Sequence, residues 1–409
     1  ERIRISKPLV FDLTKHGAVA IKAAVGTTIV MDGPGPAIQL TGSHQGTASP
    51  KSFKPKTWNE RMPIVSGIEI LGAHPEADGI ELVQTVGAII DGVSVRWCRH
   101  GIHLVNRNRN VVVANCHLYE NSGVGIYLDD VNLHQINVTG SHISYNRGGG
   151  IVVRDGNVRN LQVAGCDIEG NMPDDETPTS TANILIDVTS SADDRTRSIA
   201  EIAITGCTIQ HAANYSRSED KTIAPGGANI RLAGKPIYPI NSVTINGNVL
   251  SDTTVNLEIE HAHDVAVTGN TFFGPKPTNF RAKHSQRIVL SANTFNPRQF
   301  TRPGTIEFQD CTDCQLANST IHKFATSTGA VVLDRCTGFT LSSLSLSECG
   351  SGILLRETKD TTIANCRVSR TAEKSFDISI DGSNHNIQLV GNAFGGSVSI
   401  DQAASAASE

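Results

Sequence analysis

Short alternations of apolar and polar residues recur along most of the chain, and many of them follow one pattern, Gly-Ile-Xaa-Leu or a close variant. The pattern begins at Gly79, Gly101, Gly125 and Gly352, and related segments recur at intervals that are mostly 20 to 27 residues. Alternation of this length is typical of short β-strands. Because successive side chains of a strand point to opposite faces, Ile and Leu are predicted to face a core and Xaa to face solvent.

A second strand follows each copy and ends in a small residue and a polar one. Val265-Ala266-Val267-Thr268-Gly269-Asn270 is an example, and a brief third strand, Thr271-Phe272, comes after it. Three short strands in a repeat of about two dozen residues are the signature of a parallel β-helix, in which each turn stacks on the next. The sequence therefore predicts an all-β, single-domain solenoid. The Asn after each second strand is expected to bond to its neighbours in adjacent turns.

The repeat also sets the expected domain boundaries. Pro- and Ser-rich stretches and long spacings interrupt it and predict loop insertions. Residues 1–36 are interpreted as an N-terminal cap with entry strands, 37–402 as the β-helix with insertions near 43–63, 169–182 and 210–228, and 403–409 as a flexible tail.

Composition argues against several classes of partner. A formal net charge of −5 disfavours a general nucleic-acid or membrane-surface binder, since both need a dominant basic field. No run of 18 or more apolar residues occurs, so no transmembrane segment is expected. The nine Cys are too sparse for a disulfide framework, and Cys311-Thr-Asp-Cys314 lacks a second pair at zinc-site spacing, so the Cys are interpreted as small core side chains.

With these repeats, the chain resembles the pectin-lyase-like family of right-handed parallel β-helices over residues 37–402. That family includes polysaccharide lyases, glycoside hydrolases, uronate epimerases, phage tailspikes and non-catalytic periplasmic proteins. The resemblance implies a right-handed solenoid, a secreted or periplasmic location, and a groove along the sheet of first strands, beneath long loops. The partner that it implies is a polysaccharide or oligosaccharide.

Polar and charged residues gather at outward positions of the first strands, on the turns that flank the two longest spacings. Those spacings, of 33 and 46 residues, precede Asn183 and Asn229. Long loops in an economical repeat usually build a binding wall, so we expect the groove there. The predicted catalytic residues are Asp187, Arg231, Glu258, Glu260 and Lys283, and the predicted substrate-binding residues are His103, Tyr127, Arg154 and Arg281.

The favoured chemistry is β-elimination on an acidic, uronate-containing polysaccharide. Elimination needs a base for the proton beside the carboxylate, and cations that neutralise that carboxylate. Arg231 or Lys283 would fill these roles, and Asp129, Asp155 and Asp187 would hold Ca²⁺ through their oxygens. The layout resembles that of pectate lyases, although their Trp-Ile-Asp-His-type and Arg-Xaa-Pro-Xaa-Xaa-Arg segments are absent.

Two other chemistries stay open. A glycoside hydrolase would use Asp187 with Glu258 or Glu260, which are two turns and hence roughly 10 Å apart. A uronate C5-epimerase would use His103 and Tyr127 as acid and base. The motifs that mark polygalacturonases and alginate epimerases are absent from the chain.

The remaining alternative is a non-catalytic β-helix that binds glycans or is purely structural. Neighbouring turns of such a fold lie about 4.8 Å apart. Arg231, Glu258, Arg281 and Glu307 would then alternate in sign along an exposed sheet. A ladder of this kind avoids like-charge stacking without any substrate.

Overall fold

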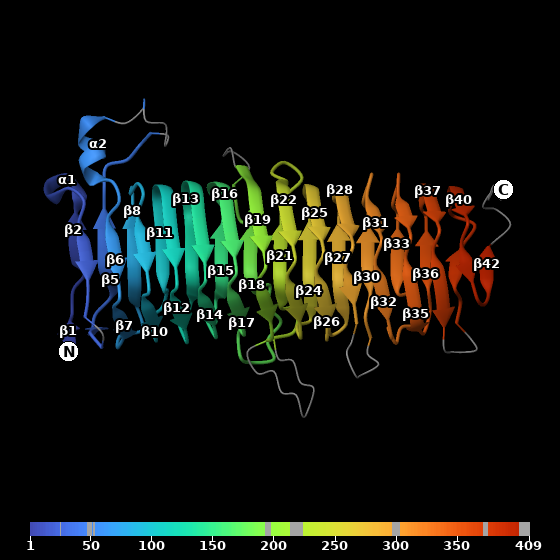
Figure 1. Cartoon of the computed structure of the whole chain (residues 1–409), viewed down its shortest axis with the longest axis horizontal. Helices are drawn as coiled ribbons and strands as arrows, with labels where there is room; N and C mark the ends of the chain where they lie inside the picture. The colour runs from blue at the N-terminus through green and yellow to red at the C-terminus, as the bar shows by residue number, and fades with distance from the viewer. Residues whose placement is uncertain are drawn as a thin grey trace. The chain divides into compact units, whose positions relative to one another are not determined.

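The computed structural model describes residues 1–24, 26–46, 51, 54–192, 198–212, 224–296, 303–370 and 375–400. The chain divides into two compact units, which we call unit 1 (Glu1–Pro225) and unit 2 (Gly226–Glu409). In each unit, three short strands recur per turn and pair in parallel with strands of the next turn (Figure 1). The predicted all-β solenoid with three strands per turn is confirmed.

The described residues of unit 1 form three rows of strands and two short helices. The helices are α1 (Leu13–His16) and α2 (Pro55–Glu60). Long strands β11 and β13 supply both the first and the second strand of their turns, because they pair along both rows. The first strands are β2 (Leu9–Asp12), β5 (Gly35–Thr41), β8 (Ala77–Val83), β11 (Ile102–Ala114), β13 (Val124–Thr139), β15 (Gly149–Arg154) and β18 (Ala182–Asp187); the other second strands are β3 (Ala20–Lys22), β6 (Ile64–Ser66), β9 (Ile89–Asp91), β16 (Asn157–Ala164) and β19 (Ser198–Thr205); the third strands are β1 (Arg2–Ile5), β4 (Thr28–Met31), β7 (Glu69–Gly72), β10 (Ser94–Arg96), β12 (His117–Tyr119), β14 (His142–Ser144), β17 (Asp167–Glu169) and β20 (Thr208–Gln210).

Unit 2 repeats the same three rows, and its described residues include no helix. Its first strands are β21 (Ala228–Ala233), β24 (Val255–Glu260), β27 (Thr278–Lys283), β30 (Ile306–Gln309), β33 (Val331–Asp334), β36 (Ile353–Arg356), β39 (Ile378–Ile380) and β42 (Val398–Ile400); its second strands are β22 (Ile240–Asn246), β25 (Ala262–Thr268), β28 (Gln286–Ser291), β31 (Gln315–Ala317), β34 (Thr340–Ser342), β37 (Lys359–Ala364) and β40 (His385–Val390); its third strands are β23 (Val249–Ser251), β26 (Thr271–Phe273), β29 (Thr294–Phe295), β32 (Thr320–His322), β35 (Ser345–Cys349), β38 (Arg367–Arg370) and β41 (Ala393–Phe394).

The inward residues of the first strands form the core, as the alternation predicts. They stack on one another through the parallel register, which pairs Ile102 with both Ile80 and Ile126. Burial of such aliphatic stacks is the main stabilising contribution to a solenoid. The predicted core residues are all 0% exposed: Ile80, Ile102, Ile126, Ile151 and Ile184 in unit 1, and Ile230 and Leu257 in unit 2.

Buried asparagines link consecutive turns at the corners. In unit 2, Asn248 donates from Nδ2 to Asn270 Oδ1, and Asn270 donates in the same way to Asn293, both at 3.1 Å. This ladder follows the second strands and confirms the predicted role of Asn. A further ladder, ahead of the first strands of unit 1, joins Asn121, Asn146, Asn171 and Asn183 at 2.8 to 2.9 Å.

The recurrent glycine of Gly-Ile-Xaa-Leu has a steric cause. A Cβ atom on Gly101 would lie 2.5 Å from the carbonyl oxygen of Gly125 in the next turn, and one on Gly125 would lie 2.7 Å from that of Gly150. Real side chains do not tolerate such contacts. Glycine is therefore required where one turn approaches the next so closely.

The predicted insertions are described in part. The region near 43–63 contains α2, and the buried Glu60 side chain accepts hydrogen bonds from the backbone and the hydroxyl of Ser43 at 2.7 Å. The insertion near 169–182 contributes Met172, which is buried with Ala212 and Ala224 in a small cluster. Residues 213–223 of the third insertion and the tail 403–409 lie outside the described residues. The described residues contain no helix long and apolar enough to span a membrane.

Candidate functional site

The outward positions of the first strands line up in two columns in unit 1. Parallel pairing sets His103 of β11 between Glu81 of β8 and Tyr127 of β13. Two residues further along the strands, Asp129 pairs with Arg154, and Arg154 pairs with Asp187. The columns predicted from the alternation are confirmed, and they bring several titratable side chains together.

His103 lies at the centre of this cluster, and its side chain is 13% exposed. Its Nε2 lies 3.2 Å from Asp129 Oδ2, a hydrogen-bond contact. Its Nδ1 lies 3.5 Å from Glu81 Oε2, an ion-pair distance without hydrogen-bond geometry. The imidazole ring is therefore held between two carboxylates.

The surroundings set the charge of each group. Burial alone would lower the pKa of His103, but Asp129 and Glu81 outweigh it and raise that pKa to about 9. The hydrogen bond from His103 lowers the pKa of Asp129, and the nearby His103 imidazolium also lowers the pKa of Glu81. Around neutral pH, His103 is thus an imidazolium between two carboxylates.

Tyr127 stacks on His103, with ring centroids 5.2 Å apart and an interplanar angle of 7°. Asp129 lies two residues further along β13, and Arg154 pairs with Asp129 by register on β15. Burial and the Asp129 carboxylate raise the pKa of Tyr127 to about 12, so the phenol keeps its proton. A neutral phenol beside a carboxylate and a cation can donate a proton to a reacting group.

His100 completes the cluster and was missed by the sequence analysis. Its ring lies 5.3 Å from that of His103 and 5.0 Å from that of Tyr127. Burial lowers the pKa of His100 to about 4, so the ring is neutral. Its Nδ1 accepts a hydrogen bond of 3.1 Å from the Val124 backbone, which leaves the proton on Nε2.

Glycine at position 123 makes room for this ring, because a Cβ there would lie 2.7 Å from His100 Nδ1. His100 belongs to the corner before β11, where alternation does not tell which way a side chain points. The signal that could have indicated it is the segment His100-Gly101-Ile102-His103, which places two histidines around the start of one strand.

Arg154 and Asp187 form the next contact along the second column. Arg154 Nη1 donates to Asp187 Oδ2 at 3.0 Å, and Asp187 also accepts from the backbone and the hydroxyl of Thr189. In the first column, Val152 and Leu185 occupy outward positions but are only 1% and 2% exposed. The outer face is therefore covered on β15 and β18, so the accessible cluster ends near Arg154.

The predicted calcium ligands do not form a metal site. Asp129 pairs with His103 and Asp187 with Arg154, while Asp155 accepts from the hydroxyls of Ser190 and Ser191. Across the described part of the chain, no group of three or more His, Cys, Asp or Glu side chains is placed to hold a metal ion. The three acids are instead neutralised or hydrogen-bonded one by one, so calcium is not supported.

Two predicted catalytic residues of unit 2, Arg231 and Glu258, form with Arg281 and Glu307 the charge ladder of the non-catalytic alternative. Arg231 Nε lies 2.6 Å from Glu258 Oε2, Arg281 Nη1 lies 3.6 Å from Glu258 Oε1, and Arg281 Nε lies 2.9 Å from Glu307 Oε2. Glu260 and Lys283 pair by backbone register on β24 and β27, and among the described residues no ion pair joins their side chains. The roles predicted for these residues stay predictions.

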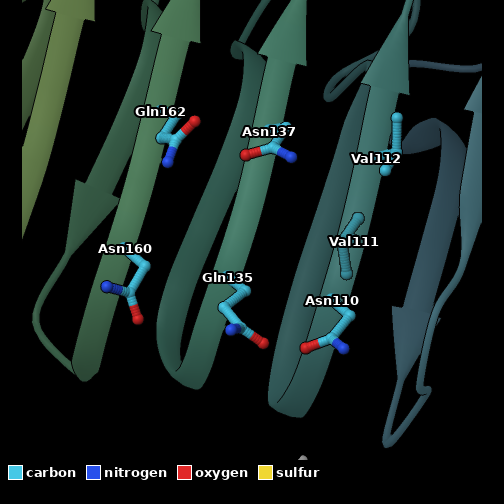
Figure 2. A pocket seen from close by; sticks show the side chains of 7 residues that line it. All are labelled: Asn110, Val111, Val112, Gln135, Asn137, Asn160 and Gln162. Carbon is cyan, nitrogen blue, oxygen red and sulfur yellow. The ribbon is translucent and has the colours of Figure 1, made fainter.

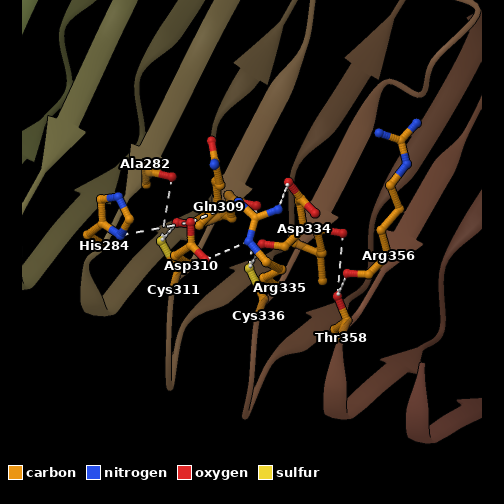
Figure 3. A network of polar contacts seen from close by, with 12 residues as sticks. Ala282, His284, Gln309, Asp310, Cys311, Asp334, Arg335, Cys336, Arg356 and Thr358 are labelled. Carbon is orange, nitrogen blue, oxygen red and sulfur yellow. Dashed lines mark hydrogen bonds and ion pairs between the residues drawn. The ribbon is translucent and has the colours of Figure 1, made fainter. Parts of the chain in front are cut away.

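Another charged network lies further along unit 2 (Figure 3). Arg335 donates to both oxygens of Asp310, at 2.8 and 2.9 Å, and to Asp334 at 2.9 Å. His284 Nδ1 lies 3.8 Å from Asp310. Arg356, on β36, is exposed and projects away from this network (Figure 3). Exposed ion pairs of this kind contribute little to stability. The exposed Arg356 is therefore suitable as a control position for mutagenesis.

A hollow of about 380 Å³ lies over the second strands of unit 1 (Figure 2). Its lining carries no titratable side chain, so it cannot exchange protons with a ligand. It is lined by Asn110, Val111, Val112, Gln135, Asn137, Asn160 and Gln162.

Fold and cluster together define a parallel β-helix with a group of titratable side chains on the outer face of its first strands. A sequence model described as "Right handed beta helix region" matches residues 68–194, and one described as "Periplasmic copper-binding protein (NosD)" matches residues 200–408. Because the second match spans more than half of the chain, the chain belongs to that family of right-handed parallel β-helix proteins. No curated protein matches the chain.

Several solved structures share the fold at low sequence identity. A surface adhesin of Streptococcus pneumoniae is 11% identical, with 91% of this chain and 83% of that chain covered and a TM-score of 0.49. The A-module of mannuronan C-5 epimerase AlgE6 from Azotobacter vinelandii is 13% identical, with 89% and 100% covered and a TM-score of 0.40. An alginate lyase from Paenibacillus sp. str. FPU-7 is 13% identical, with 72% and 95% covered and a TM-score of 0.40. Likenesses this distant transfer no activity.

Proposed function

We propose that the protein is a lyase that cleaves an acidic, uronate-containing polysaccharide by β-elimination at the cluster of His103, Tyr127, Asp129 and Arg154. The observation that carries the proposal is the stacking of the Tyr127 ring on the imidazolium of His103, which contacts Asp129 at 3.2 Å, while Arg154 pairs with Asp129 by register on the next strand. Elimination beside a carboxylate needs this combination of a proton donor, a proton acceptor and positive charge.

The charge states of the resting protein suggest the roles. Asp129 takes the proton from the carbon beside the substrate carboxylate, while the bond from the neighbouring carbon to the leaving oxygen breaks. Tyr127 gives its proton to that oxygen, and the proton on Asp129 then passes to Tyr127. One C–H and one C–O bond are replaced by a C=C double bond and an O–H bond. His103 and Arg154 stabilise the negative charge that develops on the substrate.

The geometry favours elimination over epimerisation. Epimerisation returns the proton to the opposite face of the sugar ring, so its acid and base must lie on both sides of the substrate. His103 and Tyr127, the predicted epimerase pair, lie at adjacent outward positions of one sheet with nearly parallel rings. A sugar above that sheet meets both groups from one side, which suits removal of the proton and the leaving oxygen from the same face.

The test is to incubate the protein with polygalacturonate, polymannuronate and polyguluronate, and to follow ultraviolet absorbance and reducing ends. Elimination creates an unsaturated sugar, so both signals should rise with at least one polymer. Reducing ends without absorbance would mean hydrolysis. A change of configuration without chain cleavage, seen by NMR, would mean epimerisation. Either of these results, or inertness towards all three polymers, contradicts the proposal.

The family description names copper and the periplasm. Soft thiolate and thioether ligands or imidazoles suit copper, but all nine cysteines are buried in the core. Within the described ranges, no three metal-binding side chains are grouped for an ion. These residues do not fit a copper site, and no step is assigned to the metal. We propose a periplasmic or secreted location, which the family description supports.

A further inference from the structure

Unit 1 carries two exposed aromatic residues just after third strands, which the proposed elimination does not use. Trp97 follows β10 and Tyr145 follows β14, while Tyr119 ends β12. The side chains of Trp97 and Tyr145 are 50% and 47% exposed, and they are the two most exposed aromatic side chains of the described residues. Scattered exposed aromatics need no explanation, but Trp97 and Tyr145 occupy the same corner two turns apart, with Glu120 at that corner on the turn between them.

The backbone at this corner makes bulky side chains costly. Trp97 and Tyr145 have φ angles of 60° and 56°, in the left-handed region where large residues are uncommon. Glycine would be the less strained choice, and Gly170 holds the corresponding position one turn after Tyr145, with φ of 63°. Left-handed φ angles recur at corners along the chain, and Glu120, between the two rings, has φ of 55°, so this corner accepts glycine as well as the two large side chains.

The polar neighbours fix how these rings are presented. The Trp97 indole N–H donates to Glu120 Oε2 at 2.9 Å, and the Arg96 guanidinium lies over the Trp97 ring at 4.1 Å from its centroid. The Tyr145 hydroxyl contacts Glu169 Oε1 at 3.5 Å. Glu120 occupies the corner position on the turn between the two rings, which are two turns and thus roughly 10 Å apart. The rings of Trp97 and Tyr145 thus lie on the turns before and after the carboxylate of Glu120.

We infer that this aromatic corner, defined as Trp97, Glu120 and Tyr145, binds an uncharged saccharide chain. The apolar C–H face of a pyranose ring packs on an aromatic ring, and carboxylates accept hydrogen bonds from sugar hydroxyls. The charged groups beside the two rings are two carboxylates, Glu120 and Glu169, and one guanidinium, Arg96, so a polyanionic chain meets no net positive charge here. The corner therefore selects a neutral saccharide, in contrast to the uronate polymer proposed for the His103 cluster.

The chain offers a direct spectroscopic reporter of this binding. Trp97 is one of two tryptophans, the other being Trp58. In a Trp58→Phe background, all tryptophan emission comes from Trp97. We would titrate this protein with cellohexaose, mannohexaose and laminarihexaose at millimolar concentration. At least one should produce a saturable change in emission, and calorimetry should give the same affinity with and without the Trp58→Phe change.

The matching variants remove the rings without straining the backbone. Because their φ angles are positive, Tyr145→Gly and Trp97→Gly should keep the fold, which circular dichroism checks. Each should weaken saccharide binding about tenfold in calorimetry, the loss of one stacking contact. The inference is overturned if none of the three hexasaccharides binds. It is also overturned if either folded variant binds as tightly as the parent, or if polygalacturonate binds the corner more tightly than the neutral sugars.

Discussion

At the residue scale, the carboxylates around His103 raise its pKa, and this shift makes the stability of the folded protein depend on pH. The folded-state pKa of about 9 lies above the ordinary value of 6.5. A group with a raised pKa binds its proton more tightly in the folded state. Its contribution to stability is complete below pH 6.5 and is lost as the pH rises through about 9.

We therefore expect the free energy of unfolding to fall across that pH window by on the order of 3 kcal/mol from this group. The measurement is urea denaturation at a series of pH values, compared between the wild type and His103→Gln. The difference in unfolding free energy between the two proteins should shrink as the pH rises. A difference that does not depend on pH would show that His103 is not an imidazolium in the folded protein.

Tyr127 tests the proposed proton transfer most directly. Tyr127→Phe keeps the ring that stacks on His103 but removes the hydroxyl, so the fold should survive while turnover drops by about a hundredfold or more. Initial rates on the polymer that is cleaved give the answer. Arg356→Ala, an exposed residue on a first strand of unit 2, is the matched control and should leave the rate intact. Full activity in Tyr127→Phe would remove the phenol from the mechanism.

The same scale shows where sequence reasoning stops. The outward positions of His103, Tyr127 and Asp129 follow from a period of two, and the structure confirms them. The residues that contact or surround these side chains cannot be predicted from the two-residue alternation. His100 lies in a corner, and the burial of Val152 and Leu185 depends on whatever covers their outer face. Non-local packing of this kind leaves no local pattern in the sequence.

At the scale of elements, the asparagine ladders connect turns that are about 25 residues apart in sequence. Asn146 is fully buried, accepts from Asn121 and donates to Asn171, both at 2.8 Å. A buried amide left without its partner costs its whole desolvation energy. The repeat indicated such corners, although not which asparagines would form them in unit 1.

We expect Asn146→Ala to lower the free energy of unfolding by about 2 to 4 kcal/mol, because it removes the acceptor of Asn121 and the donor to the Leu118 carbonyl inside the core. Thermal or urea denaturation measures the effect. The exposed Asn137→Ala, on β13, should change stability by less than about 0.5 kcal/mol. Equal effects of the two substitutions would contradict a stabilising role for the ladder.

At the scale of the whole molecule, the question is which unit carries the chemistry. The sequence predicts most catalytic residues in unit 2, because charged outward residues gather there beside the long loops that precede Asn183 and Asn229. In the structure, Arg231, Glu258 and Arg281 neutralise one another. Sequence alone could not separate a ladder from a site, because both place charged residues at the same outward positions.

We expect Glu258→Gln to leave turnover within about threefold of the wild type, since a partly exposed ion pair contributes little beyond local stability. Initial rates measured beside those of Tyr127→Phe decide between the units. Loss of turnover in Glu258→Gln with retention in Tyr127→Phe would return the active site to unit 2, as the sequence predicted.

The nine buried thiols have a kinetic consequence. They are spread over both units, from Cys98 to Cys366, and none forms a disulfide. Burial also raises the pKa of several of them, Cys116 for example to about 11, which suppresses the reactive thiolate. A thiol-specific reagent can therefore label each cysteine only when its own turn opens. Labelling rates read cysteine by cysteine would give the opening frequency of successive turns, and so show where unravelling of the solenoid begins.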